Sequence, residues 1–426
     1  MATLTIEDFS CVDEAEIHLA RLTVLIGPQA SGKSVISKLI YFFYDILNRQ
    51  FTDLDDEQTV DEFRASLTEE FKKWFPPSAW GPKKFVITFK AGPLFVKVTR
   101  AGAKKKVMDN DVIRIVFSPW FENQYEGILK SILERRRHRK GTKNAELGID
   151  DVWRFRSAAR KTMREQFGRD FVDWQLFVPA GRSFFTSIGK AIAAFEHSGM
   201  LDPLTVRFGR FFATIRDHRR GRVYPRQPPN EATQRNRNEM MRKLFGGNIT
   251  FDRQQEYVES DDGRKIPFAS LSSGQQELLP LWLSIEYAQE SDSDAIVYIE
   301  EPEAHLFPTA QSQIIEFLAS VISEFAPKMI LTTHSPYVLT QINILLKAGL
   351  LAREYPHASE QIDSIVRKRN WLPPSSTVAY AIVGKRVKRI TDEEGLLEGD
   401  YLDEVSDHLS HDYQRLIGIE IANEKK

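Results

Sequence analysis

The sequence predicts an α/β fold: a mixed sheet with helices and an antiparallel β lobe, joined by an Arg-rich helical insertion. Three observations support this prediction. The almost continuous apolar run Leu22–Ile26 is typical of a strand that is buried on both faces. A Gly-rich loop and an apolar helix follow it directly. The alternation of strand and helix then returns between Leu271 and Thr332, with one apolar face on the helix between the two strands.

Composition limits the class of protein. The chain has 426 residues, of which 42% are hydrophobic and 27% are charged, as in ordinary globular proteins. Its single cysteine, Cys11, excludes an intrachain disulfide and a Cys-rich zinc site, so we expect a reducing, cytoplasmic environment. The first ten residues carry acidic side chains and lack the apolar core of a signal peptide. No window approaches 18 apolar residues, so we expect no membrane partner.

The order of these patterns predicts four regions. Residues 1–120 form the first half of the central unit, with three strands at 84–89, 94–99 and 112–117 making the β lobe. Residues 121–248 are the mainly helical insertion, from which an apolar strand at 174–178 returns to the central unit. Residues 249–345 complete that unit. Residues 346–426 form a small helical and acidic region, with an amphipathic helix expected over 400–420.

A phosphate-binding loop follows the first buried strand. It matches G-x-x-x-x-G-K-S and consists of Gly27, Pro28, Gln29, Ala30, Ser31, Gly32, Lys33 and Ser34. The glycines let backbone N–H groups turn towards a polyphosphate at the N-terminus of a helix. Lys33 is expected to reach the β- and γ-phosphates of ATP, and Ser34 to bind Mg²⁺ through its hydroxyl.

Two adjacent carboxylates end the predicted strand Ala295–Ile299. Neighbouring residues in a strand point to opposite sides, so Glu300 and Glu301 cannot do the same work. We assign Glu300 to the Mg²⁺ shell and Glu301 to positioning and activating the attacking water. The alternative is that the two residues merely begin an exposed loop.

Two further polar elements follow buried or structured segments. Leu271–Glu277 places Ser272 and Gly274 at a helix N-terminus, where both could donate to a phosphate, although a simple helix cap with Gln275 or Gln276 explains the same residues. His334 follows the strand after Glu300 and Glu301. From there it could hydrogen-bond the γ-phosphate or the attacking water.

The order of the four elements resembles the head of ABC ATPases, and the resemblance covers about residues 1–48 and 265–345. It implies that Glu301 and His334 are the catalytic Glu and the switch histidine, and that a D-loop contains Glu303 and His305. It also implies a head-to-tail dimer or higher homo-oligomer. In such an assembly the signature residues act on the nucleotide of another copy: Ser272, Ser273, Gly274 and Gln275.

Two departures refine the resemblance. Ser273 stands where the usual signature has a glycine, and Glu300 stands where an aspartate is usual. Both departures are similar to the OLD/RecF/SMC-like branch of the family. Residues 27–29 and 177–183 resemble ATPases of bacterial anti-phage systems of the Septu or PARIS type. That resemblance makes Arg182, and more weakly Gln175, contacts for phosphate or water. The alternative is that Arg182 caps a strand through a salt bridge.

The resemblance also suggests a partner. The nuclease domain that follows the ATPase in OLD proteins is not expected here, because Asp400 and Asp403 have the wrong spacing for its metal cluster. We therefore expect a regulatory or sensor ATPase of an anti-phage complex that controls a separate effector nuclease. The alternatives are a RecF/SMC-like repair ATPase that binds DNA, and a scaffold that binds ATP with little turnover.

Charge is distributed unevenly along the chain. Residues 207–243 contain 11 Lys/Arg against 3 Asp/Glu, whereas residues 391–426 contain 3 against 11. The basic segment could contact nucleic acid. A solvated face, or pairing between oppositely charged surfaces of an oligomer, explains it equally well.

Overall fold

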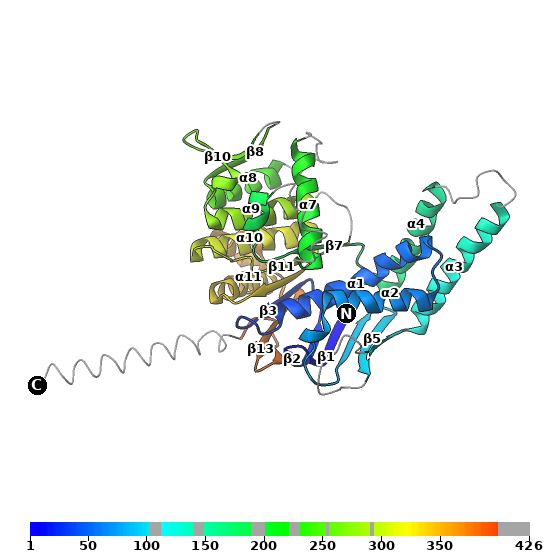
Figure 1. Cartoon of the computed structure of the whole chain (residues 1–426). Helices are drawn as coiled ribbons and strands as arrows, with labels where there is room; N and C mark the ends of the chain where they lie inside the picture. Colours follow the sequence, from blue (N-terminus) through cyan, green and yellow to red (C-terminus); the bar gives the residue numbers. More distant parts are fainter. Residues whose placement is uncertain are drawn as a thin grey trace, which may run out of the picture.

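A central mixed sheet organises the chain (Figure 1). The computed structural model describes residues 1–101, 112–139, 149–188, 201–220, 231–252, 255–289 and 294–398. Within these ranges, 11 strands form one sheet in the order β6-β5-β4-β1-β2-β14-β13-β3-β12-β11-β7. The predicted fold class, a mixed α/β sheet with helices and an antiparallel lobe, is confirmed.

Five neighbouring strands at one side of this sheet are parallel. They are β13 (Thr377–Val383), β3 (Leu22–Ile26), β12 (Lys328–Thr333), β11 (Ala295–Glu300) and β7 (Trp174–Val178). In register, Ile26 lies opposite Thr333 and Glu300 lies opposite Thr332. The carboxyl ends of β3, β12 and β11 therefore meet at the same edge of the sheet, where ligands bind in open α/β sheets.

The other side of the sheet is the antiparallel lobe. β1 pairs with both β2 and β4, and β4, β5 and β6 follow in sequence order. β14 joins the two sides, because it is antiparallel to β13 and parallel to β2. The bounds are β1 Thr3–Phe9, β2 Val12–His18, β4 Val86–Ala91, β5 Leu94–Ala101, β6 Val112–Phe117 and β14 Arg386–Arg389.

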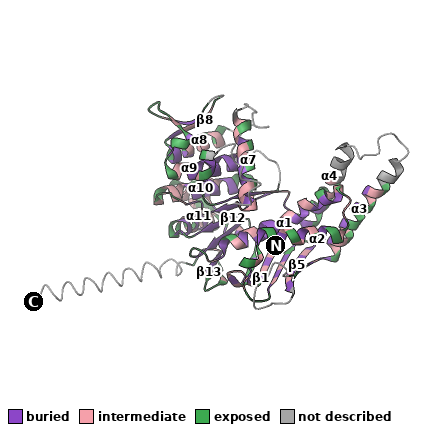
Figure 2. Ribbon diagram, viewed as in Figure 1, coloured by how far each residue is buried: buried purple, intermediate pink, exposed green. Residues whose placement is uncertain are grey.

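Helices cover both faces of the parallel strands, which explains why those strands are mostly apolar. In β11, Ile296 and Tyr298 belong to one hydrophobic cluster, while Val297 and Ile299 belong to the other. Figure 2 shows the buried positions along the sheet and on the helix faces turned towards it. The first cluster includes residues of α1 Lys33–Asp55, α2 Val60–Trp74, α3 Pro119–Arg139 and α4 Ile149–Phe167.

The second cluster includes residues of α5, α7, α8, α9, α10 and α11 together with strand residues. Figure 1 shows α9, α10 and α11 stacked over one side of the parallel strands, while α3 and α4 extend away from the antiparallel lobe. A small sheet of order β10-β9-β8 lies next to α8. The bounds are α5 Ser183–Ile188, α7 Pro203–Arg220, α8 Glu231–Phe245, α9 Ser273–Gln289, α10 Pro308–Phe325, α11 Pro336–Glu354, α12 Ser359–Ile365, β8 Gly247–Phe251, β9 Glu256–Ser260 and β10 Lys265–Pro267.

The structure departs from the sequence prediction after residue 346. We expected a helical and acidic region, yet β13 inserts beside β3 in the middle of the sheet and β14 folds back on it. Six of the seven β13 residues, from Thr377 to Ile382, are buried. This apolar run is the signal that the prediction overlooked, because the acidic composition of the following segment dominated it. The helix expected over 400–420 lies outside the described residues.

In the part of the chain that the structure describes, no helix combines the length and apolarity that crossing a bilayer requires.

We predict that Gly349→Ala destabilises the fold. A Cβ atom at Gly349 in α11 would lie 2.1 Å from the carbonyl oxygen of Leu372, so one backbone must move. Overpacking of this kind costs about 1–3 kcal/mol of unfolding free energy, which urea denaturation measures. Gly127→Ala in α3 is the control, because nothing lies within 4 Å of its added Cβ. It should stabilise slightly through helix propensity; equal effects of the two changes would contradict the prediction.

Candidate nucleotide-binding site

Three of the predicted elements lie together because β12 pairs with both β3 and β11. The Gly-rich loop leaves the end of β3, Glu300 and Glu301 end β11, and His334 follows β12. The Gly-rich loop lies far from the other two segments in the chain, but all three share one edge of the sheet. The arrangement brings a cation, two carboxylates and an imidazole to the place where a bound phosphate would lie.

The Gly-rich loop is held by its own lysine. Gly32 caps α1 with φ 107, and Ala30 has φ 59, so the loop uses left-handed backbone at two positions. The Lys33 Nζ donates to the carbonyl oxygens of Gly27 at 2.7 Å and Pro28 at 2.8 Å. Burial lowers the pKa of the Lys33 ammonium, an effect that the nearby carboxylates of Glu301, Glu303 and Glu300 oppose.

Ser34 and Glu300 provide oxygen donors of the kind that Mg²⁺ prefers. Ser34 is exposed in the first turn of α1. Glu300 is 8% exposed; its Oε2 accepts from the backbone N–H of Ala180 at 3.3 Å, and its Oε1 is buried without a hydrogen-bond partner. A buried carboxylate oxygen without a partner is costly and suits a cation or its bound water. These two side chains therefore fit the hard cation that accompanies ATP.

Glu301 and His334 face each other across the same edge. The Nδ1 of His334 lies 3.5 Å from Glu301 Oε1, and the imidazole is 40% exposed. The backbone N–H of Glu301 donates to the Thr332 carbonyl at 2.9 Å. With φ 44, Glu301 occupies the left-handed region that residues other than glycine seldom adopt. Backbone strain of this kind gathers at functional sites, where the surrounding contacts hold it.

Glu303, a member of the predicted D-loop, is buried. It is 3% exposed, and its Oε1 accepts from Thr333 Oγ1 at 2.6 Å and from the His334 backbone N–H at 3.0 Å. Glu303 thus fixes the segment that carries His334. His305 is exposed and has φ 59, so it is the member of the predicted D-loop that remains on the surface.

The predicted signature residues open α9. Ser272 and Gln275 bond reciprocally: the Ser272 N–H donates to Gln275 Oε1 at 3.1 Å, and the Gln275 N–H donates to Ser272 Oγ at 3.4 Å. The helix-cap alternative is therefore realised. It leaves Ser272 and Ser273 exposed at the helix N-terminus. A Cβ atom on Gly274 would lie 2.9 Å from the His305 carbonyl oxygen, so this position needs a glycine. The action of these residues on another copy's nucleotide stays a prediction.

Arg182 and Gln175 are engaged within the protein. Arg182 is completely buried and forms an ion pair with Glu277, with its Nε 3.5 Å from Glu277 Oε2. Burial lowers the pKa of the guanidinium, and Glu277 is the main group opposing that effect. Gln175 donates to the Tyr41 carbonyl at 3.3 Å and accepts from the Tyr298 hydroxyl at 2.8 Å. Arg182 thus forms the salt bridge of the alternative interpretation and has no exposed surface with which to reach a phosphate. The contact of Gln175 with phosphate or water stays a prediction.

Sequence reasoning missed two polar residues that support the site, Glu277 and Thr333. Glu277 is 1% exposed and Thr333 is fully buried. Glu277 ends the segment Leu271–Glu277, and Thr333 directly precedes His334. In both cases the apolar residues nearby in the sequence predict that the side chain is buried. A polar side chain at such a position needs a buried partner, and that requirement was the available signal.

Several arginines of the basic segment pair with neighbouring carboxylates. Four arginines of α7 and α8 pair with carboxylates on other elements or on the adjacent small sheet: Arg207 with Asp45, Arg216 with Glu256, and both Arg219 and Arg237 with Glu286. These four charges stabilise the packing of α7 and α8, and nucleic-acid binding by the segment stays a prediction.

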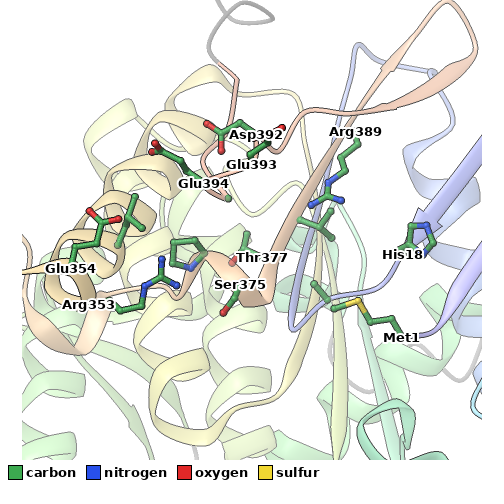
Figure 3. A pocket seen from close by; sticks show the side chains of 15 residues that line it. Met1, His18, Arg353, Glu354, Ser375, Thr377, Arg389, Asp392, Glu393 and Glu394 are labelled. Atoms are coloured by element: carbon green, nitrogen blue, oxygen red, sulfur yellow. The ribbon is translucent and has the colours of Figure 1, made fainter.

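A separate pocket lies at the opposite edge of the sheet (Figure 3). Its volume is about 300 Å³, and it lies near Ala20, Thr377 and Val378, where β3 and β13 begin. Arg353 and Arg389 face Glu354, Asp392, Glu393 and Glu394 around it. This mixture of charges selects no class of ligand, and the pocket is not part of the phosphate site.

Comparisons with known proteins identify a family. The model of the family described as "AAA domain, putative AbiEii toxin, Type IV TA system" matches residues 22–340, from β3 into α11. The match therefore contains the Gly-rich loop, both carboxylates and His334. No curated protein matches the sequence.

Solved structures similar to this chain include SMC heads. The SMC head domain from Thermotoga maritima is 14% identical, covers 92% of this chain and 98% of its own, and has a TM-score of 0.36. The Smc head with an extended coiled coil bound to the C-terminal domain of ScpA, from Pyrococcus furiosus, is 11% identical. It covers 96% of this chain and 100% of its own, with a TM-score of 0.38.

We predict that Lys33→Ala weakens ATP binding by about 100-fold, because a charge-assisted contact to phosphate is lost, equivalent to about 3 kcal/mol. Titration with a fluorescent ATP analogue, competed by ATP, measures this. Lys38→Ala is the control on the same helix, since Lys38 donates instead to Asp202 at 2.6 Å. Unchanged affinity in Lys33→Ala, or an equal loss in Lys38→Ala, would contradict the assignment.

Proposed function

We propose that this chain, which belongs to the AAA-domain family whose model it matches, binds ATP with Mg²⁺ and hydrolyses it. One observation carries the proposal. The lysine of the Gly-rich loop, the carboxylates of Glu300 and Glu301, and His334 lie at the carboxyl ends of three adjacent parallel strands. Phosphoryl transfer depends mainly on positioning and charge stabilisation, and these are the residue types that it requires.

Each residue then has a distinct part. Lys33 and the loop N–H groups hold the β- and γ-phosphates. Ser34 and Glu300 hold Mg²⁺, which supplies positive charge against the phosphate oxygens. Glu301 orients the attacking water and accepts its proton. His334, held by Glu303 through its backbone N–H, lies beside Glu301, where it can hydrogen-bond the γ-phosphate or the water.

We extend the proposal to a regulatory role. The chain assembles with further copies through its heads, and ATP turnover controls a separate effector nuclease in defence against phage. Two observations support this context: the family description names a toxin of a Type IV TA system, and short motifs resemble ATPases of anti-phage systems. The exposed N-terminus of α9, with Ser272 and Ser273 at its tip, is available to meet another copy.

The catalytic assignment predicts that Glu301→Gln lowers ATP turnover by at least about 100-fold and leaves ATP affinity within about threefold of the parent. The amide keeps the shape of the side chain but cannot accept the proton of water, and general-base catalysis contributes about 10²–10⁴-fold. Release of phosphate at saturating ATP and Mg²⁺ measures turnover, and nucleotide titration measures affinity.

Glu360→Gln, an exposed carboxylate in α12, is the matched control and should behave as the parent. If the parent and Glu301→Gln bind ATP but share a near-zero rate, the chain is a nucleotide-gated scaffold and the hydrolytic proposal is wrong. If Glu301→Gln turns over ATP like the parent, another residue is the base.

The defence role predicts that cells expressing this chain together with its neighbouring genes survive phage challenge, and that Glu301→Gln removes this protection. Plaque counts with the parent, the variant and the chain expressed alone make the comparison. Full protection by the chain alone would overturn the proposed separate effector.

A further inference from the structure

One buried guanidinium connects the N-terminal part of α9 to the loop that carries both carboxylates. Arg182 is fully buried, and its Nη1 donates to the Glu300 carbonyl oxygen at 2.6 Å. Its Nη2 donates to the Glu301 carbonyl oxygen at 3.0 Å, and its Nε donates to the Glu277 carbonyl oxygen at 3.1 Å. Arginine is the side chain whose planar guanidinium can donate to three such acceptors at once.

The carboxylate of Glu277 completes the connection from the helix side. Its Oε2 accepts from the Arg182 backbone N–H at 2.9 Å, and its Oε1 accepts from the Ser183 backbone N–H at 3.1 Å. Glu277 lies about one helical turn after Ser273 in the same helix, so one turn of α9 joins the exposed tip to this connection.

The loop after β7, which contains Arg182, also contacts Glu300, the carboxylate assigned to Mg²⁺. Ala180, two residues before Arg182, donates its backbone N–H to Glu300 Oε2 at 3.3 Å. Glu301 has φ 44, a strained conformation, and its carbonyl oxygen is one of the acceptors of Arg182. Because the guanidinium is buried, separating it from any of these carbonyls leaves a polar group without a partner. The loop and α9 are therefore held as one unit.

We propose that Arg182, paired with Glu277, is a positioning residue that couples the docking of a second copy on the tip of α9 to the placement of Glu301. The inference rests on the proposed function. Contact at Ser272 and Ser273 would shift α9, and the Arg182–Glu277 pair would carry that shift to the carbonyls of Glu300 and Glu301. Hydrolysis then depends on assembly, although Arg182 itself contacts neither nucleotide nor water.

The test compares Arg182→Lys and Glu277→Gln with the parent. Lysine keeps the charge but lacks the planar fork, and glutamine keeps the shape but lacks the charge. Arg216→Lys is the matched control, because Arg216 forms an ion pair with the buried Glu256 away from the phosphate site. For each protein we would measure ATP affinity, ATP-dependent self-association by light scattering, and turnover as a function of chain concentration.

We expect ATP affinity and self-association in both test variants to stay within about twofold of the parent. Their turnover at saturating ATP should fall by about 10–100-fold, the scale of a small misplacement of a catalytic group. The specific activity of the parent should rise with chain concentration, whereas that of the variants stays flat. Arg216→Lys should follow the parent. The double variant should be no worse than the poorer single variant, because both changes break one link.

Several results would overturn the inference. If the parent hydrolyses ATP and Arg182→Lys and Glu277→Gln match its rate and concentration dependence, the link does not couple. If affinity, self-association and turnover fall together, the pair is only structural. An inactive parent would overturn the proposed function and the inference with it. If Arg182→Lys does not fold, Glu277→Gln decides the outcome through the same split between affinity and turnover.

Discussion

The pairing of β12 with both β3 and β11 is the constraint on which the site depends. Parallel strands in register end at one edge, so the Gly-rich loop, the carboxylates and His334 meet although the chain between them is long. The pairing is stable because helices bury both faces of these strands in two hydrophobic clusters. The apolar core thus determines the geometry of the polar site, although few atoms of the core lie in that site.

Burial at this edge also determines how the polar residues are used. A carboxylate or guanidinium that leaves water must find partners, and Glu303 and Arg182 find them on the segments that carry the reactive groups. Glu303 holds the His334 segment, and Arg182 holds the Glu301 segment. These contacts offset the strain of Glu301 at φ 44, which an isolated peptide would relax. His334 and Ser34 remain exposed at this edge, while buried groups support the segment that carries His334.

The two proposals, ATP hydrolysis and its regulation by assembly, both depend on reactive groups that buried residues hold in place. In the proposed mechanism, turnover uses Lys33, Glu300, Glu301 and His334. The proposed regulation by assembly requires that the buried Arg182 and Glu277 connect these groups to a surface. The N-terminus of α9 is such a surface, and Gly274 packs it against the His305 carbonyl oxygen in addition to the Arg182–Glu277 link. In the proposed coupling, these two contacts are the route by which α9 would act on the carboxylate loop.

The sequence alone determined the elements with local signals. The apolar runs of β3, β7 and β11 and the Gly-x-x-x-x-Gly-Lys-Ser pattern depend on neighbours in the chain, so they predicted strands, loop and lysine. The tertiary structure alone decided the placement of β13 beside β3, the burial of Glu303, and the change of Arg182 from an expected ligand contact to a structural link. Each of these depends on which distant segments pack together. A sequence shows which side chains carry charge, but only the fold decides whether that charge faces water or another side chain.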